Sequence, residues 1–176
     1  MSTSYLELFP GGIAPDGSGS GNNTAALSYE VSTGTQTTNT PKATQLKLLF
    51  DADTDEHWCF PLLLPGNYGS GGTLRVKGKM TSATSGNVIL KAGQVASVDS
   101  STADGAKVFA AADLSSATTV PGTAGYTFEA AITLTTTSMA ANRHTVLFIG
   151  RDADNAGDTA TGDFELLSAM FEFTVA

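Results

Sequence analysis

The chain has 176 residues and a mass of 18.0 kDa, which suits a single domain with a sizeable hydrophobic core. Seventeen acidic residues against nine basic ones give a formal net charge of −8. This excludes a general nucleic-acid binder, because phosphate groups are bound by clustered Lys and Arg. No apolar run reaches the roughly 20 residues of a membrane-spanning helix, and the single cysteine, Cys59, excludes an internal disulfide framework.

Residues 1–41 differ in composition from the rest of the chain. Most of this segment is Gly, Ser, Thr and Asn, which bury too little apolar area to offset the entropy lost on ordering. Its first ten residues lack the basic region and the apolar core of a secretory signal. We therefore expect residues 1–41 to form an extended N-terminal arm and residues 42–176 to form the folded domain.

The arm carries two short apolar stretches, residues 5–9 and 25–31. Such a segment either stays flexible or becomes ordered against a partner, and the composition fits both outcomes. In the second case its apolar side chains are candidate interface residues. They are Leu6, Leu8, Phe9, Leu27, Tyr29 and Val31.

From residue 43 onward, apolar residues alternate with polar ones, the pattern of strands with one buried face. The clearest alternation covers residues 126–134, and two further stripes cover residues 46–50 and 74–80. The positions predicted to face inward are Leu46, Leu48, Phe50, Leu74, Val76, Met80, Tyr126, Phe128, Ala130, Ile132 and Leu134.

Two later segments complete the predicted sheets. Residues 145–151 are apolar on both faces, which indicates a central strand. In residues 164–175 the apolar alternation changes phase near Leu166, which a β-bulge or burial on both sides explains. Turn sequences separate about eight strands after residue 43, so we predict an all-β fold, an antiparallel, jelly-roll-like β-sandwich. The side chains predicted for its core include Phe128, Ile132, Leu134, Phe148 and Phe171.

Two acidic segments have spacings that begin like a calcium-binding loop. Residues 51–56 lack the central glycine and the distal glutamate of such a loop. Residues 152–163 fit better, with Gly157 in the sixth place and Asp163 in the twelfth, but Ala156 supplies no side-chain ligand. A weak calcium site and a plain turn both fit this segment, so we assign neither a metal ligand nor a cofactor.

His57 and Cys59 invite comparison with a nucleophilic Cys–His pair. Two residues apart on a strand, they share a face but lie about 6–7 Å apart, too far for a hydrogen bond. A polysaccharide-degrading enzyme would need paired carboxylates in a cleft, whereas the acids here cluster in turns. We assign no catalytic residue and expect a protein that is not an enzyme.

Arg75, Lys77 and Lys79 place three of the nine basic residues on one face of one predicted strand. In so acidic a chain, this stripe is a candidate contact with an acidic surface, such as another copy of the protein. A solvated edge strand protected by lysines gives the same pattern.

Several segments resemble a family of bacteriophage virion proteins. They are Tyr5–Pro10, Phe50–Asp51, Thr54–Trp58, Leu64–Tyr68, Gly72–Leu74, Ala83–Val88, Val120–Gly125 and Arg151–Asp163. The resemblance implies a jelly-roll-like sandwich on the outer surface of a phage particle, made in the cytoplasm of the bacterial host and often trimeric. It carries over no catalytic residues.

Two functions follow as hypotheses from this resemblance. The first is a capsid decoration (cement) protein that contacts the major capsid protein and other copies of itself. The alternative is a tail-fibre or spike tip module that binds host glycan. Apolar residues on both faces of segments such as 58–64 predict self-association, with threefold closure as the most economical arrangement.

Overall fold

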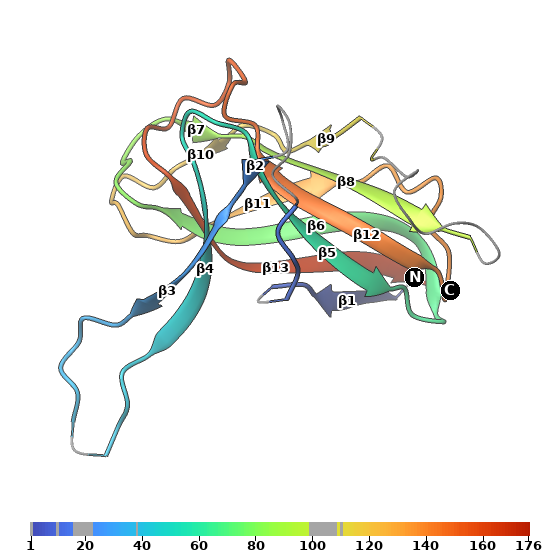
Figure 1. Cartoon of the computed structure of the whole chain (residues 1–176), viewed down its shortest axis with the longest axis horizontal. Coiled ribbons are helices and arrows are strands. Elements are labelled where there is room, and N and C mark those ends of the chain that lie inside the picture. The colour runs from blue at the N-terminus through green and yellow to red at the C-terminus, as the bar shows by residue number, and fades with distance from the viewer. Residues whose placement is uncertain (1, 10, 16–22, 38, 99–108, 110) are drawn as a thin grey trace.

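The protein is an all-β sandwich of two sheets, seen in the computed structural model of Figure 1. The predicted fold class is confirmed. No helix is found in the described part of the chain, so no described helix could span a membrane. The structure describes residues 2–9, 11–15, 23–37, 39–98, 109 and 111–176.

The first sheet has six strands. Five of them follow the order β11-β6-β13-β4-β3, and β1 pairs with the second half of β13. All its pairings are antiparallel. The strands are β1 (Thr3–Glu7), β3 (Ala26–Val31), β4 (Thr44–Phe50), β6 (Tyr68–Met80), β11 (Phe128–Thr133) and β13 (Phe164–Val175).

The second sheet has the order β2-β5-β12-β8-β9. β2 runs parallel to β5, and the other pairings are antiparallel. Because β12 lies between β5 and β8, the prediction of a central strand at residues 145–151 is confirmed. The strands are β2 (Asn23–Thr24), β5 (Glu56–Leu63), β8 (Leu90–Ser97), β9 (Asp113–Leu114) and β12 (His144–Arg151), with β7 (Asn87–Val88) and β10 (Thr118–Thr119) forming a separate pair.

Side chains from both sheets meet in one hydrophobic core. Alternation along β6 buries Leu74, Val76 and Met80, as the sequence predicts. The bulge predicted near Leu166 is also present, as a shift in the pairing with β6 between Leu166 and Ser168. Further fully buried core side chains are Leu48, Phe50, Phe60, Leu90, Ile132, Leu147, Ile149, Phe164 and Phe171.

Phe148 is buried, but outside the core in which we expected it. Its neighbours Leu147 and Ile149 point into the core, so Phe148 points to the outer face of the second sheet. There its ring packs against His57 and Phe109, with ring centres 5.3 and 4.8 Å apart. Alternation in the sequence does not distinguish a core position from a covered position on the outer face.

Three other positions predicted to face inward differ in the structure. Tyr126 precedes β11 and is 64% exposed, and Phe128 is half-buried at the margin of the core. Leu46 has the expected orientation but is 42% exposed, because this part of β4 extends beyond the second sheet. Fewer side chains are therefore buried in the core than the apolar alternation in the sequence predicts.

Residues 1–41 are not an arm lying outside the sandwich. Their described parts include β1, β2 and β3, which pair with β13, β5 and β4. Leu8, Phe9 and Ala25 are buried in the core, and Leu6 packs against it. The apolar stretches of this segment thus find strand edges within their own sandwich, which offsets the ordering cost. Residues 16–22 lie outside the described part.

Candidate functional site

β3 and β4 form an antiparallel hairpin that projects from the sandwich (Figure 1). β4 pairs with β13 at Leu48–Phe50, so the hairpin beyond these residues leaves the body of the sheet. Among the residues that the structure describes, β3 is the last strand on its side of the sheet.

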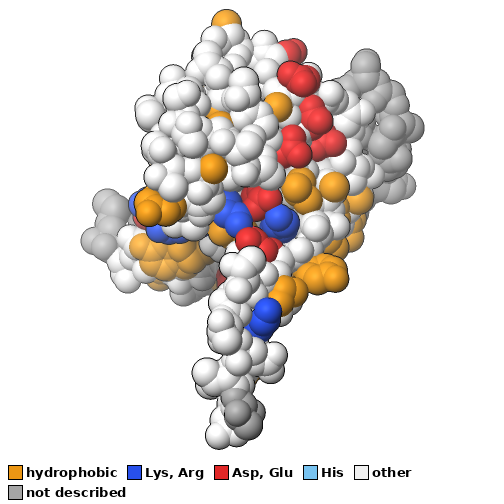
Figure 2. Space-filling view, turned by 90° about the vertical axis from the view of Figure 1, so that its left-hand side faces the viewer, with side chains coloured by type: hydrophobic (Ala, Val, Ile, Leu, Met, Phe, Trp, Pro, Cys, Tyr) orange, Lys and Arg blue, Asp and Glu red, His pale blue; other side chains and the backbone are white. Residues whose placement is uncertain are grey.

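One face of this hairpin is apolar and open to solvent. Leu27 pairs with Leu48, and Tyr29 pairs with Leu46. Because Leu48 points into the core, the side chains of this face continue the core outward. Exposed fractions are 54% for Leu27, 67% for Tyr29, 42% for Val31 and 42% for Leu46. We call these four residues the hairpin stripe; Figure 2 shows apolar side chains along one side of the projection.

The opposite face of the hairpin is polar and fixed by ion pairs. Lys79 Nζ donates a hydrogen bond of 2.6 Å to Glu30 Oε2 and lies 3.3 Å from Glu165 Oε2. Lys47 Nζ donates a hydrogen bond of 2.6 Å to Glu165 Oε1, and the Glu165 side chain is only 4% exposed. Figure 2 shows basic and acidic side chains gathered at the base of the projecting hairpin. These ion pairs connect β3, β4, β6 and β13 and hold the hairpin in one orientation.

The ion pairs shift two pKa values in this cluster. The hydrogen bond from Lys79 lowers the pKa of Glu30, although its partial burial opposes this. Burial disfavours the charged form of Lys79, but the hydrogen bond to Glu30 and the charge of Glu165 outweigh burial and raise the pKa of Lys79. Both groups therefore remain ionised, and paired, over a wider pH range than isolated side chains would.

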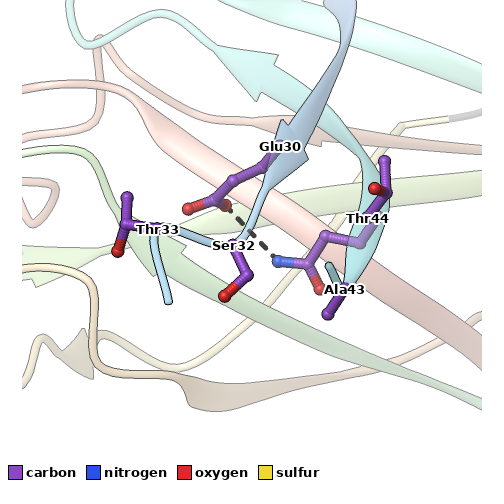
Figure 3. Close-up of a pocket in the computed structure, with 6 residues that line it drawn as sticks. Glu30, Ser32, Thr33, Ala43 and Thr44 are labelled. Atoms are coloured by element: carbon purple, nitrogen blue, oxygen red, sulfur yellow. Dashed lines mark hydrogen bonds between the residues drawn. The ribbon is translucent and has the colours of Figure 1, made fainter. Parts of the chain in front are cut away.

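A shallow depression of about 370 Å³ lies on this polar side, between the two strands of the hairpin (Figure 3). Gln45 Nε2 donates a hydrogen bond of 3.4 Å to Glu30 across it. None of the lining side chains is aromatic, so the depression offers no ring on which a sugar could stack. Its lining residues are Glu30, Ser32, Thr33, Ala43, Thr44 and Gln45.

The predicted basic stripe lies on one face of β6, but acidic neighbours neutralise it. Arg75 donates hydrogen bonds to Glu172 and to Glu129, the second at 3.1 Å, and these bonds raise the pKa of Arg75. Lys77 lies 3.8 Å from Glu129, and Lys79 belongs to the cluster at the hairpin base. β6 lies between β11 and β13, so it is not an edge strand either. The edge-strand interpretation is therefore wrong. Contact with another acidic surface stays a prediction, and the sequence does not show that acids of the same sheet already pair with these side chains.

The structure divides the six predicted interface residues of the N-terminal segment into two groups. Leu8 and Phe9 are buried in the core and Leu6 packs against it, so these three are not available to a partner. The other three, Leu27, Tyr29 and Val31, are exposed members of the hairpin stripe.

His57 and Cys59 share the outer face of β5 but do not form an activated pair. Burial lowers the pKa of His57 and raises the pKa of Cys59, which favours the neutral imidazole and the protonated thiol. His57 Nδ1 is buried and has no hydrogen-bond partner in the described structure. Backbone hydrogen bonds join Cys59 to Ile13 at 2.8 and 3.0 Å. This environment suits packing rather than nucleophilic chemistry.

The two acidic segments considered as calcium loops meet at one end of the sandwich. Carboxylate oxygens of Asp55, Asp152 and Asp154 lie within 4.8 Å of one another. The Lys91 ammonium forms an ion pair with Asp55 and lies 3.2 Å from Asp152 Oδ1, so a side chain of the protein already supplies positive charge there. The Ala153 N–H donates a hydrogen bond of 2.7 Å to Asp55. Nothing in the sequence pattern indicated that Lys91 joins these segments.

Arg151 organises the remainder of the loop that follows β12. Its side chain is fully buried, and its guanidinium donates to both carboxylate oxygens of Asp158, at 2.7 and 3.0 Å. Further hydrogen bonds reach the carbonyl oxygens of Ala160 and Gly162 at 2.6 and 2.8 Å. Asp158, the seventh position of the predicted calcium-loop spacing, is therefore engaged by a cation of the protein.

Among known proteins, the chain shows a distant structural similarity to a solved structure. No protein-family model matches the sequence, and no curated protein matches it. Among solved structures, the chain is similar to a family 11 carbohydrate-binding module from Clostridium thermocellum in complex with a β-1,3-1,4-mixed-linked tetrasaccharide. The match covers 96% of this chain and 94% of that chain, with 11% identity and a TM-score of 0.44. A similarity of this size carries no conclusion about ligand or activity.

Proposed function

We propose that this chain is a non-enzymatic structural protein on the outer surface of a phage particle, a capsid decoration (cement) protein. The observation that carries this proposal is the hairpin stripe. Its four exposed apolar side chains lie next to one another on a projecting element that ion pairs hold in place. Contiguous apolar surface of this kind marks a contact with another macromolecule.

The energy available from the hairpin stripe is sufficient to matter. Completing the burial of one large apolar side chain contributes up to about 1.5–3 kcal/mol. The four side chains are already about half covered, so a partner that buries the rest gains on the order of 3–5 kcal/mol before association costs. One such contact is weak, but the many contacts of a decorated shell add up.

A non-enzymatic role agrees with how the reactive side chains are used. Glu165 and Asp158 are buried carboxylates paired with Lys and Arg, rather than facing each other across a cleft. His57 and Cys59 lie in surroundings that suppress their reactivity. A general acid or base needs a free, correctly protonated group near a substrate, which these four residues do not provide.

The location on a virion rests on the resemblance of the sequence segments to phage virion proteins. The proposed partners are the major capsid protein and further copies of this chain. For the latter we propose a homotrimer, because β5 also has an apolar outer face: Cys59, Pro61 and Leu63 point away from the core, and Leu63 is 65% exposed.

Rebinding to particles that lack the protein tests this function. Tyr29→Ser removes the most exposed member of the hairpin stripe, and Tyr126→Ser is a matched control, since Tyr126 is 64% exposed elsewhere. We expect wild type and Tyr126→Ser to saturate the particles at equal concentrations, and Tyr29→Ser to need about tenfold more, equivalent to about 1.4 kcal/mol. Equal occupancy by all three proteins, or no binding of wild type, would overturn the proposal.

A further inference from the structure

The outer edge of β3 carries backbone N–H and C=O groups that point away from β4. The Ser32 N–H donates a hydrogen bond of 2.7 Å to the Ala43 carbonyl oxygen, towards the β4 side of the hairpin. Successive residues of a strand direct their N–H and C=O groups to opposite sides. Leu27, Tyr29 and Val31 therefore turn these groups away from β4, towards the edge where the described structure has no further strand.

This edge lacks the features that usually prevent strands from pairing between chains. β3 has the sequence Ala-Leu-Ser-Tyr-Glu-Val, without proline or lysine, and its pairing with β4 runs without a bulge. Natural edge strands are protected by such residues, by bulges or by a covering element. Its apolar face, the hairpin stripe, is exposed along the same residues.

We infer that β3 pairs with β3 of a second copy of this chain, antiparallel, about a twofold axis at Tyr29. This inference names a partner for the edge of the hairpin and rests on the proposed assembly function. Tyr29 then lies opposite Tyr29 of the partner subunit, and Leu27 opposite Val31 of the partner subunit. The two hairpin stripes join on one face of a continuous sheet.

Hydrogen bonding selects this register over its neighbours. Three pairs form between outward-directed residues, and each exchanges two hydrogen bonds, which gives six in total. If one strand is shifted by one residue, the outward-directed N–H and C=O groups of one copy lie opposite residues of the other copy whose backbone groups are already bonded to β4. A shift by two in one direction requires Ala25, whose N–H already donates to the His57 carbonyl oxygen at 3.2 Å.

Charge excludes the shift by two in the other direction and favours a second copy as the partner. That shift would place Glu30 opposite Glu30 of the partner subunit, and like charges directly opposite destabilise a sheet. In the proposed register Glu30, the one charged residue of β3, faces Ser28 of the partner subunit and keeps its own ion pair with Lys79. Two chains of net charge −8 thus meet through segments whose own charge is already neutralised.

The twofold contact is compatible with closed assemblies. Used alone it gives a dimer, and combined with the proposed threefold contact it gives a hexamer with threefold and twofold axes. Loss of the β3 contact would convert the dimer to a monomer, or the hexamer to a trimer, and so halve the mass of the assembly in solution.

Cysteine cross-linking of purified protein tests the register. In a Cys59→Ala background, Tyr29→Cys places two thiols on directly opposite residues, whose Cα atoms lie about 5.5 Å apart, within the range of a disulfide. We expect Tyr29→Cys to form a covalent dimer on oxidation. Ser28→Cys is the matched control, because the two Ser28 residues lie diagonally across the strands, about 7–8 Å apart, too far for a disulfide. Equal cross-linking of both variants, or none of Tyr29→Cys, would refute the register.

Light scattering on Tyr29→Pro tests the pairing itself. Proline at residue 29 removes an edge-directed N–H and leaves the bonds to β4 intact, a substitution that edge strands tolerate. We expect wild type to have twice the mass of Tyr29→Pro, with the thermal transition of the variant confirming that it is folded. Equal masses would overturn the inference. Because neither experiment contains phage particles, their failure leaves the rebinding of Tyr29→Ser as an independent test of the proposed function.

Discussion

The Lys91 ammonium forms ion pairs with two carboxylates from distant parts of the chain, Asp55 and Asp152, so its removal has a predictable cost. Its side chain is 12% exposed, against 20% for Asp55 and 15% for Asp152. Lys91→Ala leaves both of these carboxylates and Asp154, with oxygens within 4.8 Å of one another, without the cation that separates their charges. The variant therefore has a folded state with concentrated negative charge.

The size of this effect follows from Coulomb's law. At an effective dielectric constant of about 20, two unit charges about 5 Å apart repel by about 3 kcal/mol. Salt and the exposure of Asp154 reduce the repulsion, so we expect a loss of about 2–3 kcal/mol in the free energy of unfolding. For a chain of this length the melting temperature falls by about 4–12 °C.

Thermal denaturation with and without millimolar Ca²⁺ measures the effect and its cause. In Lys91→Ala the three carboxylates become an oxygen-ligand cluster of the kind that Ca²⁺ accepts, so added Ca²⁺ should restore part of the lost melting temperature. Lys77→Ala is the matched control: Lys77 is 57% exposed and 3.8 Å from Glu129, and its loss should cost less than about 0.5 kcal/mol. Equal losses for the two variants, without a Ca²⁺ response in Lys91→Ala, would refute the assigned role of Lys91.

Three further predictions concern the fold. Arg151→Met leaves the Asp158 carboxylate buried without its partner and should cost about 3–5 kcal/mol in urea denaturation, whereas adding Asp158→Asn should recover part of this loss; no recovery would contradict the assignment. Because the pKa of Glu30 is lowered from 4.5, its ion pair stabilises the fold fully above that value and is lost as the pH falls through the folded pKa. The melting temperature of Glu30→Gln should therefore fall less steeply with acid than that of wild type, and parallel curves would argue against the pair. Deleting residues 1–41 removes three strands and the buried side chains of Leu8 and Phe9. The burial of each of these two side chains contributes about 1.5–3 kcal/mol, so the truncated chain should lose its cooperative thermal transition. A transition like that of the full chain would identify the segment as a dispensable arm.

Local periodicity predicts much of the sandwich. The alternation along β6 identifies Leu74 and Val76 as core residues, and the phase change near Leu166 identifies the bulge, because both depend on neighbours in sequence. The N-terminal strands are different. Five residues of alternation in β1 are too few to distinguish a strand from an arm, and the edge that β1 covers belongs to β13, at the other end of the chain.

The charged residues of the candidate site depend on contacts that sequence spacing does not contain. The order of residues places Arg75 on a strand face, but only the register of the sheet places Glu129 and Glu172 beside it. The same is true of Lys91, which lies between acids from two loops. Composition indicated apolar residues in the N-terminal segment, and pairing with β4 decided which of them remain exposed.

Counting the copies of this chain in purified virions tests the proposed function most directly. Quantitative mass spectrometry, with the major capsid protein of the same phage as the internal standard, gives the ratio of the two proteins. A capsid decoration protein should be present in hundreds of copies per particle, in a fixed ratio to the capsid protein. A few dozen copies or fewer would place the chain on the tail, as the glycan-binding alternative requires, and absence from the particle would contradict a virion role altogether.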